Sequence, residues 1–166
     1  MGAIALTFSL IVFRIVAPNL KLQSVIIKNL KFNSSSSPPY LNMTFIAEIQ
    51  IKNDNFGTFK FQNSSTSVFY NGTLIGTSGF LGGEVRGRET EIMNVTMKVS
   101  SNVWVNQTYL NSDLNSGLVK LRSYADFRGK VRVLKIARQS KVSVLDCTMN
   151  LNLTSKAIQD LLCEES

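Results

Sequence analysis

The sequence predicts a mainly β fold in which two antiparallel sheets pack as a β-sandwich, with about seven strands and one short helix. Three observations predict it. Most segments after residue 17 alternate apolar and polar residues with a period of two, as half-buried strands do. Turn signals rich in glycine, asparagine and serine separate these segments. Each strand then has one apolar face to bury, and two packed sheets bury all such faces.

Residues 1–16 are expected to be the outer part of a membrane anchor. The run from Gly2 to Phe13 is apolar over about a dozen residues, and Arg14 interrupts it, whereas a helix needs about 20 apolar residues to cross a bilayer. Three interpretations fit: the outer end of an anchor that begins before this chain, an uncleaved signal anchor, and a buried strand. We favour the first, which makes residues 17–166 one folded domain.

The first strands are expected at residues 20–32 and 41–52, on either side of a Ser- and Pro-rich loop. In the second segment the odd positions are apolar and, except for Ile46, the even positions are polar. Strict alternation over this length predicts a half-buried antiparallel strand. A hairpin follows at residues 66–77, because Asn71-Gly72 is the strongest short-range turn signal.

The middle of the chain is less regular. Four glycines within residues 79–87 indicate irregular chain. The alternation returns in residues 90–99, which predicts a strand. It is lost again in residues 102–115, where Leu110 and Leu114 have a weak helical spacing, so one short helix is expected there.

The last strands are expected at residues 118–127, 131–136 and 142–153. Each alternates apolar and polar residues, and Gly129 is expected to break the run between the first two. The segment 142–153 is expected to be the final strand.

Asn-X-Ser/Thr sites, which accept N-linked sugars, occur seven times, whereas chance supplies about 3 at this composition. The sites fall on polar strand positions or in loops, so every one could carry a sugar without burying it. This predicts a glycoprotein that folds outside the cytosol. The candidate glycosylation sites are Asn33, Asn42, Asn63, Asn71, Asn94, Asn106 and Asn152.

Two cysteines, Cys147 and Cys163, are present. In an oxidising, sugar-adding compartment they would most simply form one disulfide. Such a bridge closes a loop of about 16 residues and contributes roughly 3 kcal/mol to stability. Two free thiols are the alternative.

Residues 128–141 contain basic residues and no acid, within a chain of net charge +7. Arg128, Lys130 and Arg132 share parity, so in a strand they project from one face; we call them the basic stripe. The stripe could bind acidic polysaccharide or anionic lipid headgroups. It is also typical of a solvated sheet edge that resists aggregation. Nucleic acid is not expected as a partner, because glycosylation and nucleic-acid binding seldom share a compartment.

Catalysis is not expected. The chain has no histidine, which removes the usual general base, the Ser-His-Asp arrangement and the commonest metal ligand. Two cysteines without a Cys-X-X-Cys motif exclude a cysteine-rich metal site. The acids form no spaced constellation. We therefore expect no cofactor, no metal and no catalytic residue.

Several motifs together resemble the plant late embryogenesis abundant group 2 family, whose members are also called hydroxyproline-rich glycoprotein or harpin-induced-like proteins. They occur in order over nearly the whole chain. The motifs are Val12-Phe13-Arg14, Asn42-Met43-Thr44-Phe45, Asn53-Asp54-Asn55-Phe56-Gly57, Tyr70-Asn71-Gly72, Ser123-Tyr124-Ala125, Gly129-Lys130-Val131, Asp146-Cys147-Thr148-Met149 and Ile158-Gln159-Asp160-Leu161-Leu162-Cys163. The chain departs from the family at Asp54, where a proline is usual, so a looser turn is expected.

The resemblance implies a sandwich of fibronectin-III or immunoglobulin character. It also implies a single-pass plasma membrane protein with its C-terminal domain outside the cytosol, linked to stress, desiccation or defence signalling. The expected function is non-catalytic binding at the boundary between membrane and cell wall. The alternative is a lipid-binding or lipid-transfer module with an apolar groove between its sheets.

Overall fold

The computed structural model of the protein describes residues 2–12, 14–101 and 104–165, which contain ten strands and two helices. In chain order the elements are α1 (Gly2–Val12), β1 (Asn19–Asn33), β2 (Tyr40–Lys52), β3 (Thr58–Phe61), β4 (Ser64–Tyr70), β5 (Thr73–Phe80), β6 (Gly83–Val85), β7 (Thr90–Ser100), α2 (Gln107–Ser116), β8 (Leu118–Val133), β9 (Ala137–Asn152) and β10 (Ala157–Glu165).

The strands form two antiparallel sheets. One sheet has the order β1-β2-β7, and the other has the order β10-β9-β8-β3-β6. Strand β4 pairs with the first half of β8 while β3 pairs with its second half, and β5 extends the sheet beyond β4. The prediction of a mainly β protein with two antiparallel sheets is confirmed; its fibronectin-III or immunoglobulin type stays a prediction.

The two sheets enclose one apolar core. The odd residues of β2 from Leu41 to Ile51 are buried, as their alternation predicts, and they face buried residues of β8 and β9. Four phenylalanines close the core toward β3 and β6, with ring centroids 4.8–5.8 Å apart. Offset and edge-on aromatic pairs of this kind add to the free energy gained by burial.

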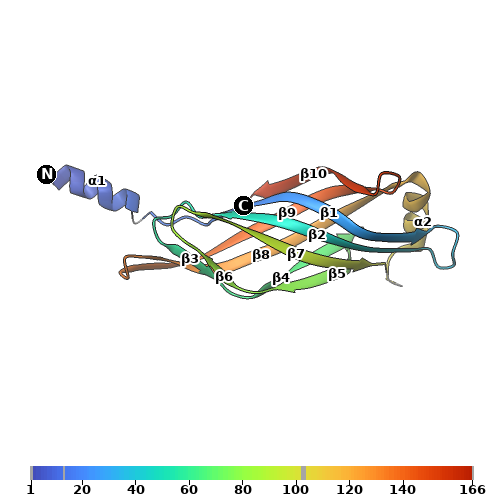
Figure 1. Ribbon diagram of the computed structural model, residues 1–166, viewed down its shortest axis with the longest axis horizontal. Coiled ribbons are helices and arrows are strands. Elements are labelled where there is room, and N and C mark those ends of the chain that lie inside the picture. The colour runs from blue at the N-terminus through green and yellow to red at the C-terminus, as the bar shows by residue number, and fades with distance from the viewer. Residues whose placement is uncertain (1, 13, 102–103, 166) are drawn as a thin grey trace.

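The two ends of the elongated molecule differ. Helix α1 projects from one end, where the turn between β8 and β9 also lies, and α2 lies at the opposite end with the β1–β2 loop (Figure 1). Within the described residues, no helix is both long and apolar enough to cross a membrane. Because α1 is helical, the interpretation of this segment as a buried strand is wrong.

Gly129 does not break β8, contrary to the sequence prediction. The strand runs unbroken from Leu118 to Val133, and residues 134–136 form a turn instead of a strand end. The glycine is needed because β3 lies too close for a side chain: a Cβ at Gly129 would lie 2.3 Å from the Lys60 carbonyl oxygen and 2.7 Å from the Phe59 ring. A glycine within a strand pattern can mark such a close approach.

Three strands were not predicted. Strands β3 and β6 have 4 and 3 residues, which is too short for a period of two to show. Strand β10, and not residues 142–153, ends the chain. Its alternation is interrupted by a register shift between Gln159 and Leu162, around Asp160 at φ 53°.

Helix α2 confirms the short helix expected within residues 102–115, of which residues 102–103 lie outside the described residues. Its caps explain its bounds. The Asn106 side chain accepts hydrogen bonds from the backbone N–H groups of Thr108 and Tyr109, and Gly117 ends the helix at φ 83°. Leu110 and Leu114 are its buried residues.

Candidate functional site

The basic stripe lies on the outer face of the second half of β8. Arg128, Lys130 and Arg132 are exposed, while the neighbouring Phe127 and Val131 are buried in the core. The alternation of the strand therefore places all three cations on one solvent-facing surface.

Neighbouring strands widen the stripe into a grid of positive charge. Lys60 of β3 lies opposite Lys130, and Arg138 of β9 lies opposite Arg132. Neighbouring strands lie about 4.8 Å apart, and every second residue along a strand lies about 6.7 Å apart. Charges spaced in this way in two directions suit a polymer or a surface with repeated anionic groups.

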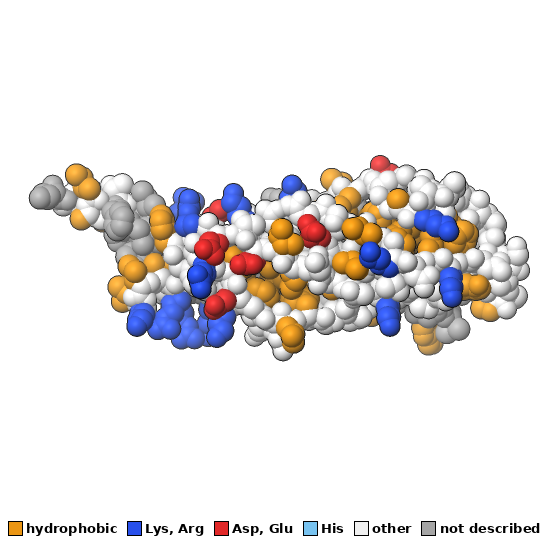
Figure 2. Space-filling view, viewed as in Figure 1, with side chains coloured by type: hydrophobic (Ala, Val, Ile, Leu, Met, Phe, Trp, Pro, Cys, Tyr) orange, Lys and Arg blue, Asp and Glu red, His pale blue; other side chains and the backbone are white. Residues whose placement is uncertain are grey.

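These residues line a groove of about 720 Å³, which we call the basic groove. Six of its lining residues are cations and one, Glu84, is an acid. Figure 2 shows Lys and Arg side chains gathered at the end of the molecule from which α1 projects. The full lining consists of Thr58, Lys60, Phe61, Gln62, Glu84, Arg128, Gly129, Lys130, Arg132, Arg138, Ser140, Lys141 and Val142.

The cations of the stripe are not equivalent. Arg128 Nε lies 2.8 Å from an Asp126 carboxylate oxygen, and the Ser64 hydroxyl donates to the same carboxylate at 2.9 Å. The bond from Arg128 lowers the pKa of Asp126 more than burial raises it. Among the described residues, Lys130 and Arg132 form no salt bridge. These two are therefore freer to bind an external anion.

The candidate glycosylation sites are all accessible. Asn33, Asn42, Asn63, Asn71, Asn94 and Asn106 are exposed, and Asn152 is half-buried. Asn152 is also distinctive because its Nδ2, the atom that would carry a sugar, donates to Gln159 at 3.1 Å. Occupancy of these sites stays a prediction.

Five of the seven sites lie around α2, at the end opposite α1. Asn33 and Asn42 flank the β1–β2 loop, Asn106 caps α2, and Asn152 ends β9 (Figure 1). Asn71 lines the same hollow as residues of α2. The end that carries the β8–β9 turn holds none of these five.

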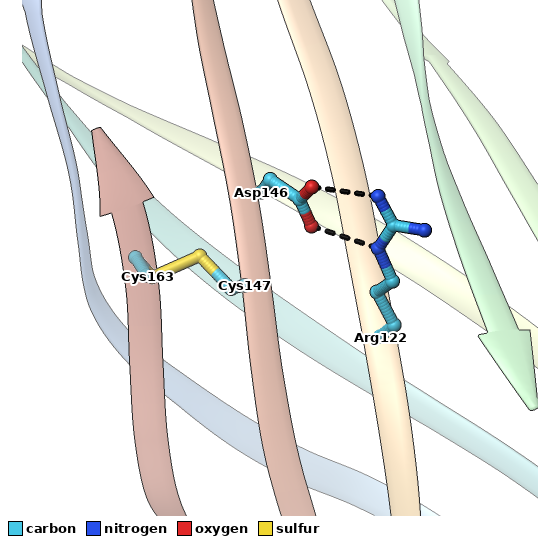
Figure 3. Close-up of a disulfide and its surroundings, with 4 residues drawn as sticks. All are labelled: Arg122, Asp146, Cys147 and Cys163. Carbon is cyan, nitrogen blue, oxygen red and sulfur yellow. Dashed lines mark hydrogen bonds and ion pairs between the residues drawn. A yellow bond between two sulfur atoms is a disulfide. The ribbon is translucent and has the colours of Figure 1, made fainter. Parts of the chain in front are cut away.

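Cys147 and Cys163 are joined in a disulfide, with Cα atoms 4.0 Å apart. They are register partners on β9 and β10, and Cys147 is fully buried. Beside them Arg122 and Asp146 point toward each other from β8 and β9 (Figure 3), with two hydrogen bonds of 2.9 and 2.6 Å. These bonds lower the pKa of the Asp146 carboxyl. The disulfide between Cys147 and Cys163 ties β10 to β9 and so to the rest of the sheet.

Two buried asparagines form a feature that sequence reasoning missed. Asn53 and Asn55 are each 1% exposed. The Asn53 amide donates to the carbonyl groups of Gly57 and Val85, both at 2.9 Å, which fixes the turn after β2. Asn55 instead binds the backbone of Val16, just after the α1 segment. The Asn-Asp-Asn spacing was a signal for a turn, but nothing in it indicated the contact with Val16.

The core is tightly packed where described residues of the two sheets meet. The space lined by residues of both sheets, including Leu22, Phe45, Val68 and Met149, measures about 20 Å³. A cavity that size holds one water molecule at most, because a water needs about 10–15 Å³ of this measure. At this position the packing leaves no room for an acyl chain, and the alternative of an apolar lipid groove stays a prediction without support from this cavity.

Groups of three or more potential metal ligands are not found among the residues that the structure describes. Two acids of the sheet surfaces, Asp126 and Asp146, instead form ion pairs with Arg128 and Arg122.

Comparison with known proteins assigns the family. Residues 48–148, more than half of the chain, match the family model described as late embryogenesis abundant protein, LEA_2. A curated late embryogenesis abundant protein of Arabidopsis thaliana is 38% identical over 164 residues, which are 98% of this chain and 76% of the relative.

Solved structures resemble the chain more loosely. A crystal structure from Archaeoglobus fulgidus is 10% identical, with a TM-score of 0.43 over 77% of this chain and 95% of that one. A solution structure from Arabidopsis thaliana is 9% identical, with a TM-score of 0.42 over 83% and 86%. Likeness at this level carries no functional argument. The family match and the close relative agree with the motifs, and the chain belongs to the late embryogenesis abundant family, group LEA_2.

Proposed function

We propose that this protein is a non-catalytic binding module of the plant cell surface, acting in the response to stress and desiccation or in defence signalling. Membership of the family indicates a role related to stress. In this proposal the N-terminal segment tethers the protein to the plasma membrane. The folded domain lies outside the cytosol, carries N-linked sugars and binds at the boundary between membrane and wall.

The observation that carries the proposal is the basic groove. It concentrates six cations on the outer face of one sheet, against one acid in its lining. A pectin-like polysaccharide has a carboxylate on successive sugars, so one chain laid along the groove could meet several cations at once. Because the groove is open to solvent, the attraction is screened by salt and weakens as ionic strength rises.

Two further features support an extracytoplasmic site. All seven Asn-X-Ser/Thr sites are at least partly accessible, so sugars could be attached without disturbing the core. The disulfide joins the last two strands, and structural disulfides persist in oxidising compartments. A solvated, aggregation-resistant sheet edge would explain the cations but not these two features.

Binding to pectin tests the proposal. We expect that the triple variant Arg128→Ala, Lys130→Ala, Arg132→Ala binds pectin roughly ten- to hundredfold more weakly, because it removes half of the cations that line the groove. The matched control is Lys21→Ala, Lys28→Ala, Lys31→Ala, which removes three exposed cations from β1. This control has the same net charge as the triple variant of the basic stripe. Equal losses in the two variants would show a general charge effect and would contradict a specific groove.

A further inference from the structure

The β8–β9 turn presents apolar side chains to solvent at the end of the molecule from which α1 projects. Leu134 is 70% exposed and Ile136 is 79% exposed, on either side of Lys135. We call these three residues the hairpin tip. Single exposed apolar residues are ordinary, but two large ones at the point of a projecting hairpin are not needed for packing.

The backbone conformation of the tip is one that these residues do not favour, so turn formation does not explain why they occur there. Leu134 and Lys135 have φ of 52° and 63°, in the left-handed region that a bulky side chain disfavours, and Ile136 N–H donates to Val133 O at 3.2 Å. The β4–β5 turn meets the same demand with Asn71 and Gly72, the residues that such turns favour. The apolar tip therefore costs conformational energy, which points to a role outside the fold.

Cations flank the tip on both of its strands. Arg132 and Arg138 flank it as register partners, and no Asp or Glu occurs in the sequence between Asp126 and Asp146. Apolar residues within a basic ring complement an anionic membrane surface, where the apolar groups enter the interface and the cations bind headgroups. An acidic polysaccharide would use the cations but would leave Leu134 and Ile136 in water.

The fold also directs the tip toward the side where the chain would leave a membrane. The tip and α1 lie at one end, while five of the seven glycosylation candidates lie around α2 at the other (Figure 1). The two hydrogen bonds between Asn55 and Val16 hold the segment after α1 to this end. Phe56, which is 49% exposed, follows Asn55 on the same loop and adds another apolar side chain there.

We propose that the hairpin tip docks into an anionic lipid bilayer, with Leu134 and Ile136 in the interface and Lys135, Arg132 and Arg138 against phosphate headgroups. This docking holds the domain end-on against the membrane. The inference rests on the tethering proposed above for its orientation. It concerns the apolar hairpin tip, which lies next to the basic groove and shares Arg132 and Arg138 with it.

The depth of the tip in a bilayer tests the inference. The full chain carries a nitroxide label at Ile136→Cys and is reconstituted into phosphatidylcholine vesicles with and without phosphatidylserine. We expect the label to become accessible to dissolved oxygen and to lose access to a water-soluble nickel chelate when phosphatidylserine is present. A label at Lys156→Cys, in the exposed β9–β10 turn, is the control and stays accessible to the chelate.

Further substitutions in the labelled protein show which side chains keep the label in the bilayer. Leu134→Ser or the pair Lys135→Gln, Arg138→Gln should return the label to water, whereas Leu162→Ser, which removes another exposed leucine on β10, should not. A label that stays equally accessible to the chelate with and without anionic vesicles overturns the inference. So does a label that pectin protects and vesicles do not.

The outcome is separable from the groove proposal. Leu134→Ser leaves every cation of the groove in place, so pectin binding should be unchanged. Loss of pectin binding in the groove variants, with a tip that stays in water, would leave the groove proposal standing and remove only the docking. A label that enters the bilayer, in a protein that does not bind pectin, would leave the docking proposal standing and remove the groove proposal.

Discussion

Asn55 and Val16 hold each other through two hydrogen bonds: the Val16 N–H donates to Asn55 Oδ1, and Asn55 Nδ2 donates to the Val16 carbonyl, both at 2.8 Å. The Asn55 side-chain amide thus serves Val16 both as an acceptor and as a donor. The Ser143 hydroxyl adds a bond to the Pro18 carbonyl at 2.6 Å. The segment that joins α1 to β1 is thus fastened to the domain at two points.

Removing the Asn55 amide should destabilise the domain and loosen this segment. Asn55→Ala removes the partner of the Val16 N–H and C=O and one of the two donors to the Asn53 side-chain Oδ1, so we expect a loss of about 2–4 kcal/mol in the free energy of unfolding. Urea unfolding measures this loss, and hydrogen exchange of the Val16 amide measures the loosening. Asn19→Ala is the control, because the Asn19 side chain makes an exposed bond to Asp54. Equal effects of the two substitutions would refute the role given to Asn55.

Reducing the disulfide should lower stability without abolishing the fold of the other strands. The bridge closes a loop of 16 residues, which predicts a contribution of about 3 kcal/mol. Unfolding midpoints with and without reductant measure it, and the double variant Cys147→Ala, Cys163→Ala is the control that reductant should not affect. If reductant leaves the midpoint of the parent protein unchanged, the bridge contributes nothing to stability.

Acidic pH should lower the stability of the domain, because two of its carboxylates are paired with arginines. The Arg122 hydrogen bonds lower the pKa of Asp146, and the Arg128 bond lowers that of Asp126. A carboxyl whose pKa is lower in the folded state gives stability that is fully present above its unfolded pKa, about 3.9. That stability is lost as the pH falls through the folded pKa. Because both pairs are exposed to solvent, screening keeps the contribution of each one small.

The substitution Arg122→Ala tests this directly. We expect the pKa of Asp146, followed by carbon NMR of its carboxyl, to rise toward its ordinary value, and the acid branch of the stability curve to flatten. Lys120→Ala, two residues earlier on the same face of β8, is the control. A pKa of Asp146 that does not change in Arg122→Ala would show that the ion pair is not formed in solution.

The three residues of the basic stripe should contribute unequally to polyanion binding. Arg128 is already bonded to Asp126, so Arg128→Ala should weaken pectin binding less than Lys130→Ala or Arg132→Ala does. Conversely, Asp126→Asn should strengthen binding, because it releases Arg128 and removes a negative charge beside the groove. Binding isotherms at two salt concentrations measure these differences. Three equal single-substitution losses would contradict the distinction drawn from the ion pair.

Much of the fold was predictable because its longest strands have one solvent-exposed face and one buried face. Strand β2 shows this best, since its alternation predicted its bounds to within one residue. The failures have physical causes. Gly129 serves a close contact with β3 that the sequence does not reveal, and β3 and β6 are too short to show a period.

The candidate site was predictable only in part. The parity of Arg128, Lys130 and Arg132 follows from one strand, so the sequence was enough to put them on one face. Lys60 joins them only because β3 pairs with β8, and that pairing links residues about seventy positions apart. The contact between Asn55 and Val16 likewise depends on tertiary structure.

The central claim is that this domain folds in a sugar-adding, oxidising compartment with all seven Asn-X-Ser/Thr sites accessible. Mass spectrometry of the protein purified from plant membranes, before and after enzymatic deglycosylation, tests it most directly. We predict sugar on several of the seven sites, a corresponding fall in mass on enzyme treatment, and no free thiol at Cys147 or Cys163. An unmodified, fully reduced protein recovered from the cytosol would contradict the account.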